Sequence, residues 1–381
     1  MWWVATRLML LVVSYISLTF LSTPHPQGRP TIPTNVTLAY TVSRWTLWDG
    51  NVYRAIALGN YHTSITAAFF PLYPLLIRIA MVFTGTSKTQ SFAAALLVGN
   101  LGTLGAFFGV GLLAARERKL VAAASGSLRV LAAYPLASFL AAAYTDGLFL
   151  GLACGALVCA RRGSWYWAAL WAFLAGLTRP TAVILILPLV WEYFHQRMPR
   201  RTLPQLRAVP RLALVVGAVP LALASYSVYC AIHFHDPLAY LHAQARYNIR
   251  AQWPWQTIFL IAQQLLHASS SSFVHARILV DTLPVCAIAL ICVVGWRTRP
   301  AAMSLYLVGL ILLTLSSPIV GAQFPDAIAG AGRFMLAAAP AWLDLGRWSV
   351  RSPWLDTLLV SGGFAVQALL VAFVLTGGWL I

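Results

Sequence analysis

Apolar residues fill the chain in long runs that short polar segments separate. The runs lie at about residues 5–22, 91–115, 120–138, 141–160, 165–178, 181–195, 209–232, 273–296, 301–320, 334–346 and 354–380. A transmembrane helix needs about 20 mostly apolar residues, so the pattern predicts an all-α polytopic membrane protein with about 10–11 transmembrane helices. Several runs are short or contain Pro or Gly, which predicts tilted or broken helices packed against one another.

Basic residues gather in clusters between these runs, as at Arg116–Lys119, Arg161-Arg162, 197–211 and Arg297–Arg299. The positive-inside rule places such clusters in the cytoplasm. The outer side then receives two segments rich in Trp, Tyr and Pro, residues 23–90 and 233–272. We expect the first to lie along the interface as short amphipathic helices, and the apolar run Ala67–Phe83 within it to enter the membrane and return. Residues 1–381 form one expected integral-membrane domain without a sustained internal repeat.

Composition narrows the class of protein further. Apolar residues make up 60% of the chain and charged residues 9%, whereas soluble domains carry about 25% charged residues. The net charge of +17 would suggest a nucleic-acid partner in a soluble protein. Here the basic clusters flank apolar runs, which indicates anionic membrane lipids and no nucleic acid. The five cysteines lie in apolar runs without the spacing of a metal site, and no metal is expected.

Four of the nine acidic residues, Asp49, Asp146, Asp236 and Asp326, fall near the outer face in this topology. An ionisable group at membrane depth is a candidate for function. Asp49 is the clearest, because aromatic residues flank it in the segment Arg44–Arg54. It is either a general base partly shielded from water or the N-cap of an interfacial helix that starts near Gly50. The local residues favour neither interpretation.

The segment Phe69-Phe70-Pro71-Leu72-Tyr73-Pro74 lies twenty residues beyond Asp49. We expect its two prolines to break any helix and to leave backbone groups that line a cavity or are buried in protein. A plain structural kink is the alternative.

These motifs resemble those of a known family. Trp48-Asp49-Gly50, the stretch Ile56–Tyr61 and Phe69–Pro74 are similar to the signature of the PIG-V-type (GPI mannosyltransferase II-like) enzymes. These are polytopic glycosyltransferases of the GT-C class that use lipid-phosphate sugar donors. Weaker matches follow in order at Ala143–Phe149, Leu177–Pro180 and Gly332–Leu336. The chain departs from the family at Asp146, where a Glu is common, and at Pro180-Thr181-Ala182, where Asn-Gly often follows, so acceptor identity is the least transferable property.

The resemblance implies a mechanism and roles for particular residues. Asp49 would deprotonate the acceptor hydroxyl while mannose leaves polyprenyl or dolichyl phosphate with inversion. Arg179 and Arg333, with Arg78 and His62 as second choices, would bind the donor phosphate. Asp146, Asp236, Trp48 and Tyr73 would orient the sugar or the acceptor. For any single arginine, snorkelling to a lipid phosphate is the alternative role.

The lipid donor that the resemblance implies is consistent with the motifs that the sequence lacks. It has no P-loop, GxGxxG or DxD-like motif, which argues against a nucleotide donor held through a metal, and no cofactor is expected. A transporter or flippase of a lipid-linked saccharide is the alternative function. Transporters carry polar residues near the midplane of repeated halves, whereas the candidates here gather on one face. The membrane would be the plasma membrane in a prokaryote or the endoplasmic reticulum in a eukaryote; protein partners are not indicated.

Overall fold

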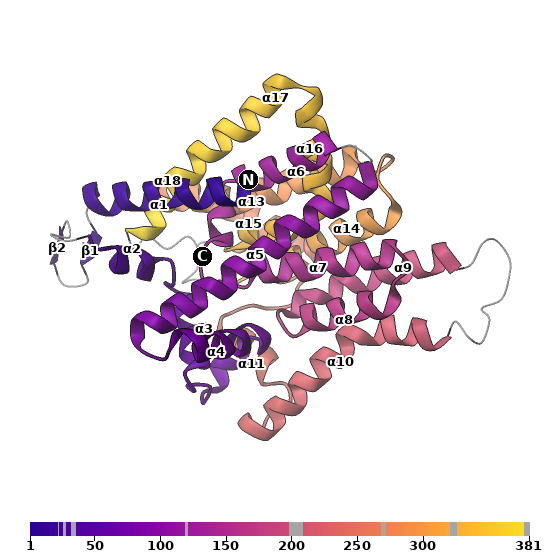
Figure 1. The fold of residues 1–381 in the computed structure, drawn as a ribbon, viewed down its shortest axis with the longest axis horizontal. Helices are drawn as coiled ribbons and strands as arrows, with labels where there is room; N and C mark the ends of the chain where they lie inside the picture. The colour runs from indigo at the N-terminus through magenta and orange to yellow at the C-terminus, as the bar shows by residue number, and fades with distance from the viewer. Residues whose placement is uncertain are drawn as a thin grey trace. The chain divides into compact units, whose positions relative to one another are not determined.

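The computed structural model describes the chain apart from residues 22, 26–27, 32–35, 119–120, 198–208, 268–271, 321–325 and 377–381. Lys119 and most of the basic segment 197–211 therefore lie outside the described residues. Helices account for nearly all regular structure in the described part (Figure 1). In chain order they are α1 (Trp2–Phe20), α2 (Leu38–Arg44), α3 (Asp49–Ala57), α4 (Leu72–Thr84), α5 (Lys88–Arg118), α6 (Val121–Ala133), α7 (Asp146–Arg161), α8 (Trp165–Gly176), α9 (Ile186–Arg197), α10 (Val209–Phe234), α11 (Ala239–Arg246), α12 (Pro254–His267), α13 (Ser272–Val294), α14 (Ala301–Leu315), α15 (Ala331–Phe334), α16 (Ala339–Arg351), α17 (Pro353–Thr357) and α18 (Gly363–Leu375).

Short irregular elements join several of these helices. They are the 3-10 turns η1 (Ser64–Ala68), η2 (Ala137–Leu140), η3 (Pro180–Leu185) and η5 (Met335–Ala337), and a π-helical turn, η6 (Leu358–Gly362). The first outer segment also contains a small antiparallel hairpin of β1 (Thr23–His25) and β2 (Gly28–Thr31), which the sequence did not predict. The expected loop 233–272 likewise contains α11 and α12.

The helical membrane architecture is confirmed. Within the described residues, five helices are long and apolar enough to cross a membrane: Trp2–Phe20, Lys88–Glu117, Pro210–Phe234, Phe273–Val294 and Pro353–Leu375. Other apolar runs form shorter helices that irregular turns interrupt. The expected span 181–195, for example, divides into η3 and α9. Broken helices of this kind are tolerated at membrane depth only where other parts of the protein bind the freed backbone groups.

One expectation about the prolines was wrong. Pro71 precedes α4, but Pro74 lies inside its first turn instead of breaking it. A proline is tolerated there because the first N–H groups of a helix have no intrahelical acceptor. With 13 residues, α4 is about 20 Å long against a hydrocarbon core of about 30 Å. The expected course in which the run Ala67–Phe83 enters the membrane and returns stays a prediction.

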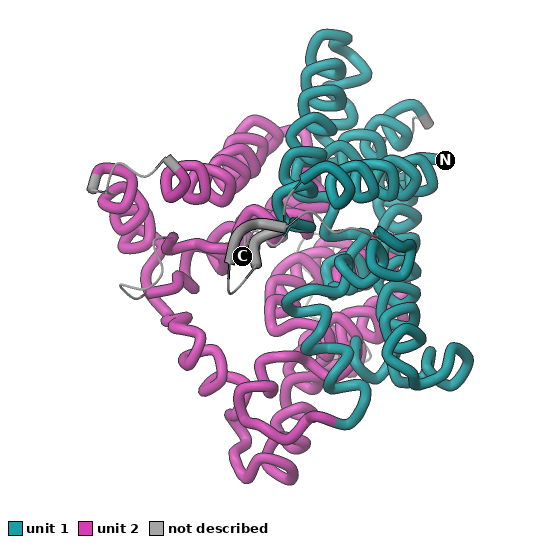
Figure 2. The backbone as a smooth tube through the Cα atoms, turned by 90° about the vertical axis from the view of Figure 1, so that its left-hand side faces the viewer, with its two compact units in different colours: residues 1–59, 73–148, 342–381 teal, residues 60–72, 149–341 magenta. Residues whose placement is uncertain are grey.

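The chain divides into two compact units (Figure 2). Unit 1 comprises Met1–Gly59, Tyr73–Leu148 and Trp342–Ile381, and unit 2 comprises Asn60–Leu72 and Phe149–Ala341. Each unit is assembled from separate stretches of sequence. The single domain expected from the sequence stays a prediction.

A half-buried arginine and a set of aliphatic side chains hold unit 1 together. Leu10 and Leu18 of α1 pack with Val371 and Leu375 of α18 in one apolar cluster. Beside it, Arg7 donates hydrogen bonds from Nε to Asn100 Oδ1 and from Nη2 to Leu140 O, both at 2.8 Å. Arg7 of α1 thus provides a hydrogen-bond donor for a backbone carbonyl of η2, the turn between α6 and α7.

Two neighbouring glycines provide a test of this packing. A Cβ at Gly363 would collide with the carbonyl oxygen of Ala133, whereas a Cβ at Gly362 meets nothing within 4 Å. We expect Gly363→Ala to lower the free energy of unfolding by about 1–3 kcal/mol through overpacking. Gly362→Ala should leave it unchanged or raise it by up to about 1 kcal/mol, because alanine favours helix. Thermal unfolding of both variants in detergent measures the difference, and equal melting temperatures would contradict this packing.

Candidate functional site

The segment that carries Asp49 has a strained backbone. Trp48 adopts φ 56° and ψ −122°, a conformation that residues other than glycine rarely take. Such strain persists only where the surrounding structure enforces it, and it is concentrated at functional sites. Asp49 is half-buried and is the first helical residue of α3, with Trp48 in the N-cap position. This placement weighs against the interpretation of Asp49 as the N-cap.

Within unit 1, the segment that leads to Asp146 is hydrogen-bonded directly to the segment that leads to Asp49. Ala143 N donates to Trp45 O at 3.0 Å, and Tyr144 Oη donates to Leu47 O at 3.0 Å. The two backbones approach so closely that a Cβ at Gly50 would lie 3.2 Å from Ala143 O. The structure therefore brings together the segments that carry Asp49 and Asp146.

Asp146 and Tyr73 lie in the buried part of this region. Asp146 is 3% exposed and begins α7, where a carboxylate interacts favourably with the positive end of the helix dipole. Its charge acts on the phenol of Tyr73, which donates a hydrogen bond to Ala95 O at 3.0 Å. Tyr73 also contacts Tyr53 edge to face, with 5.0 Å between ring centroids. Two of the residues predicted to orient substrate are thus neighbours.

Unit 1 also has a hollow beside Trp48. It has a cavity volume of about 20 Å³, room for about one water molecule, and is lined by Arg44, Trp45, Leu47, Trp48, Ser138, Phe139, Ala142, Tyr144, Val371, Val374 and Leu375. Arg44 is fixed at its edge by a hydrogen bond from Nε to Leu375 O at 2.7 Å.

In unit 2, two predicted phosphate-binding residues meet at one aromatic ring. The Cζ atoms of Arg179 and Arg333 each lie 5.9 Å from the centroid of Phe334. Arg333 is only 5% exposed, and Arg179 is half-buried at the start of η3. Two guanidinium groups that share one aromatic ring place positive charge in this part of unit 2, and such charge favours an anion such as phosphate.

The segment Asp326–Ala337, which contains α15 and which we call the Arg333 loop, is fastened by a buried carboxyl group. Asp281 of α13 accepts hydrogen bonds from Gly330 N at 3.1 Å and from Gly332 N at 2.8 Å. Gly330 has φ +81°, which favours glycine at this turn. Asp326 lies beside Asp281, and burial raises the pKa of the Asp326 carboxyl group. Asp281 therefore binds the main chain on both sides of Ala331, two residues before Arg333.

Two further helices fix the same loop. Gln264 Oε1 of α12 accepts a hydrogen bond from Ala327 N at 2.9 Å, and Tyr306 Oη of α14 donates to Ala337 O at 3.0 Å. Neither residue was a candidate from the sequence, because nothing local to them signals which distant backbone group they bind.

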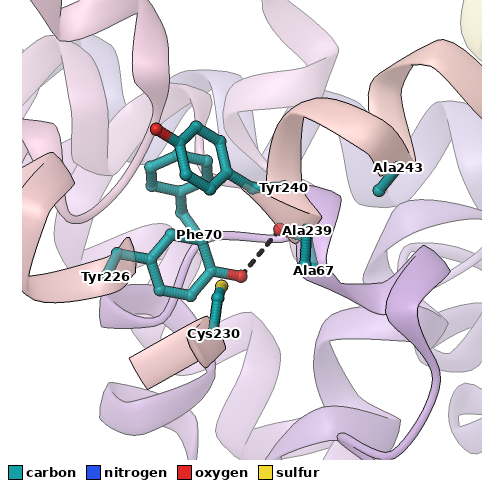
Figure 3. Packing of buried hydrophobic residues seen from close by; sticks show 7 residues of the cluster. All are labelled: Ala67, Phe70, Tyr226, Cys230, Ala239, Tyr240 and Ala243. Carbon is teal, nitrogen blue, oxygen red and sulfur yellow. Dashed lines mark hydrogen bonds between the residues drawn. The ribbon is translucent and has the colours of Figure 1, made fainter. Parts of the chain in front are cut away.

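Phenols fasten the Phe69–Pro74 motif (Figure 3). Tyr226 Oη donates to Ala67 O at 2.7 Å, and its ring lies 4.7 Å from that of Phe70. Tyr61 Oη is 2.6 Å from Phe69 O. At the end of the motif, Leu72 N donates to Leu177 O at 3.0 Å, two residues before Arg179. The motif is therefore joined directly to the turn that presents Arg179.

Comparisons with known proteins bear on the fold. No protein-family model matches the sequence, and no curated protein matches it. Among solved structures, ArnT from Cupriavidus metallidurans bound to undecaprenyl phosphate matches with a TM-score of 0.53 and 15% identity, over 98% of this chain and 76% of that chain. The apo state of the same protein matches with a TM-score of 0.51 and 15% identity, over 98% of this chain and 75% of that chain. An oligosaccharyltransferase from Archaeoglobus fulgidus tethered with an acceptor peptide matches at 0.45 and 12%, over 99% and 55%.

The fold is that of the GT-C glycosyltransferases. Within this GT-C fold the remaining candidates lie at exposed positions or in local turns. Arg78 and His62 are exposed. Asp236 accepts a hydrogen bond from Leu238 N at 3.0 Å and lies 2.7 Å from His242 Nδ1, and the hydrogen bond between these two side chains lowers the pKa of Asp236.

The described residues include no group of three or more His, Cys, Asp or Glu side chains that would hold a metal ion. The chemistry available to the candidate residues is that of carboxylates, guanidinium groups and phenols.

Asp281→Asn tests the fastening of the Arg333 loop. The substitution keeps the shape but replaces one acceptor oxygen with an NH₂ group facing an N–H donor. We expect it to lower the free energy of unfolding by about 1–3 kcal/mol, the cost of a buried polar group left unsatisfied. The matched control is Asp356→Asn, which breaks a partly exposed ion pair with Arg129 at 2.7 Å and should cost about 1 kcal/mol or less. Thermal unfolding decides, and an equal loss in both variants would contradict the role of Asp281.

Proposed function

We propose that the protein is a membrane glycosyltransferase that transfers a sugar from a polyprenyl- or dolichyl-phosphate donor to a hydroxyl group of a lipid-linked or glycolipid acceptor. The observation that carries this proposal is the pair Arg179 and Arg333 around Phe334. It occurs in a chain with a GT-C fold, and a solved structure with that fold contains undecaprenyl phosphate. A phosphate-headed donor fits two guanidinium groups at an apolar ring.

The chemistry requires little beyond positioning and charge. The leaving group is a phosphate that is already a stabilised anion, so transfer needs positive charge around it more than an acid. Arg179 and Arg333 would supply that charge, with Arg78 and His62 in supporting positions. Neither a metal nor a cofactor is part of this proposal.

Asp49 is the proposed general base. It would accept the proton of the acceptor hydroxyl as the oxygen attacks the anomeric carbon, and the lipid phosphate would leave from the opposite face with inversion. The strained Trp48 fixes where α3 begins and so where Asp49 lies. Asp146, Tyr73, Trp48 and Asp236 are the proposed residues that orient the sugar or the acceptor.

The finer assignment follows the resemblance of the motifs. Trp48-Asp49-Gly50 and Phe69–Pro74 support a PIG-V-type enzyme, and hence mannose as the sugar and the outer or lumenal side as the place of transfer. The membrane would be the plasma membrane of a prokaryote or the endoplasmic reticulum of a eukaryote. The direct hydrogen bonding of the segments that carry Asp49 and Asp146 supports a common role for these two acids.

Asp49→Asn tests the general base. The amide keeps the size of the side chain but cannot accept the proton, so transfer from polyprenyl-phosphate mannose should fall about 10²–10⁴-fold. Binding of the donor and yield of the protein should change little, because other residues hold the phosphate. Asp356→Asn, which lies in an ion pair with Arg129, serves as the control with normal transfer. Full activity of Asp49→Asn would end this assignment and favour Asp146 or Asp236 as the base.

Arg333→Lys and Arg179→Lys test the phosphate site. Lysine keeps the charge but loses the planar fork that binds two phosphate oxygens at once. We expect the KM for the lipid-phosphate sugar to rise about 10–100-fold, in line with the loss of a hydrogen bond to a charged group. Arg297→Lys, at an exposed position, is the control. An unchanged KM in both test variants, measured with radiolabelled donor, would remove these arginines from the donor site.

A further inference from the structure

A long apolar groove runs between α8 and α10 in unit 2. It has a volume of about 720 Å³ and is lined by Tyr166, Ala169, Leu170, Phe173, Ala213, Leu214, Gly217, Ala218, Pro220, Leu221 and Ala224. Small residues create the hollow: a Cβ at Gly217 would meet no atom within 4 Å. The helices are in direct contact where Gly176 faces Ala222, since a Cβ at Gly176 would lie 2.7 Å from that of Ala222. The groove opens along the remaining length of α8.

The other end of the groove carries a cation. Arg211, in the first turn of α10, places its Cζ 6.0 Å from the ring centroid of Tyr166, in the first turn of α8. The two helices therefore run parallel, with both N-termini at this end. Helix N-termini carry partial positive charge, which adds to that of Arg211. Apart from Arg211 and the Tyr166 hydroxyl, the described groove offers a ligand only apolar side chains and backbone.

This combination specifies a ligand with an apolar chain and an anionic head. The clusters before α8 and α10 place this end in the cytoplasm by the positive-inside rule, where anionic lipid headgroups are abundant. Arg179 follows the opposite end of α8, which is about 18 Å long at 12 residues. A phosphate at Arg211 is therefore separate from one at Arg179, and the groove is distinct from the proposed donor site.

We infer that the groove binds an anionic phospholipid, with one acyl chain between α8 and α10 and the phosphate at Arg211. The chain would cover exposed apolar residues of both helices, such as Leu170, Leu214 and Leu221. Arg211 would gain a charge-assisted hydrogen bond to the phosphate in place of water. The occupant would hold α8 and α10 at their open end, as Gly176 and Ala222 hold them at the other.

The test measures binding of phosphatidylglycerol and of phosphatidylcholine with identical acyl chains to the full-length protein by native mass spectrometry. Gly217→Leu places a large side chain in the groove, where a Cβ would meet no other atom within 4 Å, and Arg211→Gln removes the positive charge at the end of the groove. Gly105→Leu, also in open space, and Arg297→Gln, at an exposed position, are the matched controls. Melting temperatures in lipid-free detergent establish that each variant folds.

The expected result is retention of phosphatidylglycerol over phosphatidylcholine by the native protein and a loss of at least about tenfold in both test variants, with neither control affected. Equal binding of the two lipids would overturn the proposal, as would unchanged binding in Gly217→Leu. Polyprenyl phosphate serves as the competitor. If it displaces phosphatidylglycerol from the native protein and Arg211→Gln abolishes its own binding, the groove belongs to the donor and not to a phospholipid. Should Arg211→Gln fail to fold, the comparison of phosphatidylglycerol binding by Gly217→Leu and by its control Gly105→Leu still tests the proposal.

Discussion

Every interruption of a helix inside a membrane frees backbone groups that water cannot reach, and the fold depends on how these groups find partners. Here the partners are side chains from other helices. Arg7 binds Leu140 O, Thr103 Oγ1 donates to the same carbonyl at 2.6 Å, and Asn100 Nδ2 donates to Ala141 O at 3.1 Å. In unit 2, Tyr226 and Asp281 do the same for the turns at Ala67 and Gly330. Helix breaks and buried polar side chains are therefore two aspects of one requirement.

This requirement explains where the few acids lie. A buried carboxylate needs either a cation or several N–H donors, because desolvation penalises its charge. Glu192, 3% exposed, receives Arg161 at 2.9 Å, whereas Asp281 uses two backbone amides. Asp49 differs, because it is half-buried and follows a residue in a strained conformation. A carboxylate that remains partly accessible in a fixed position suits proton transfer better than a structural role.

The sequence predicted the features that depend on local pattern. Hydrophobic runs predicted the helical membrane fold. Because the chain has only nine acidic residues, the sequence also indicated the segments that carry Asp49 and Asp146, and the structure shows these segments hydrogen-bonded to each other. Features that depend on tertiary contacts were missed. Tyr226 binds a carbonyl 159 residues away, and Asp281 binds an amide 49 residues away. Periodicity shows which side chains are buried but not which distant backbone group each one meets. Pro74 was misjudged because its effect depends on where α4 begins, and helix ends are the least defined feature of a sequence.

The same backbone bonding determines how the arginines are held. Electrostatic stabilisation of a leaving phosphate is effective when the positive groups are fixed before the reaction, since no free energy is then spent on reorienting them. Arg333 belongs to a loop that α12, α13 and α14 fasten through Gln264, Asp281 and Tyr306. Arg179 belongs to a turn joined to the Phe69–Pro74 motif by the bond from Leu72 N to Leu177 O. Rigidity of the two cations thus comes from contacts to the main chain that carries them. Conserving the charge of an arginine would not by itself conserve the site, because its position depends on residues that never touch the ligand.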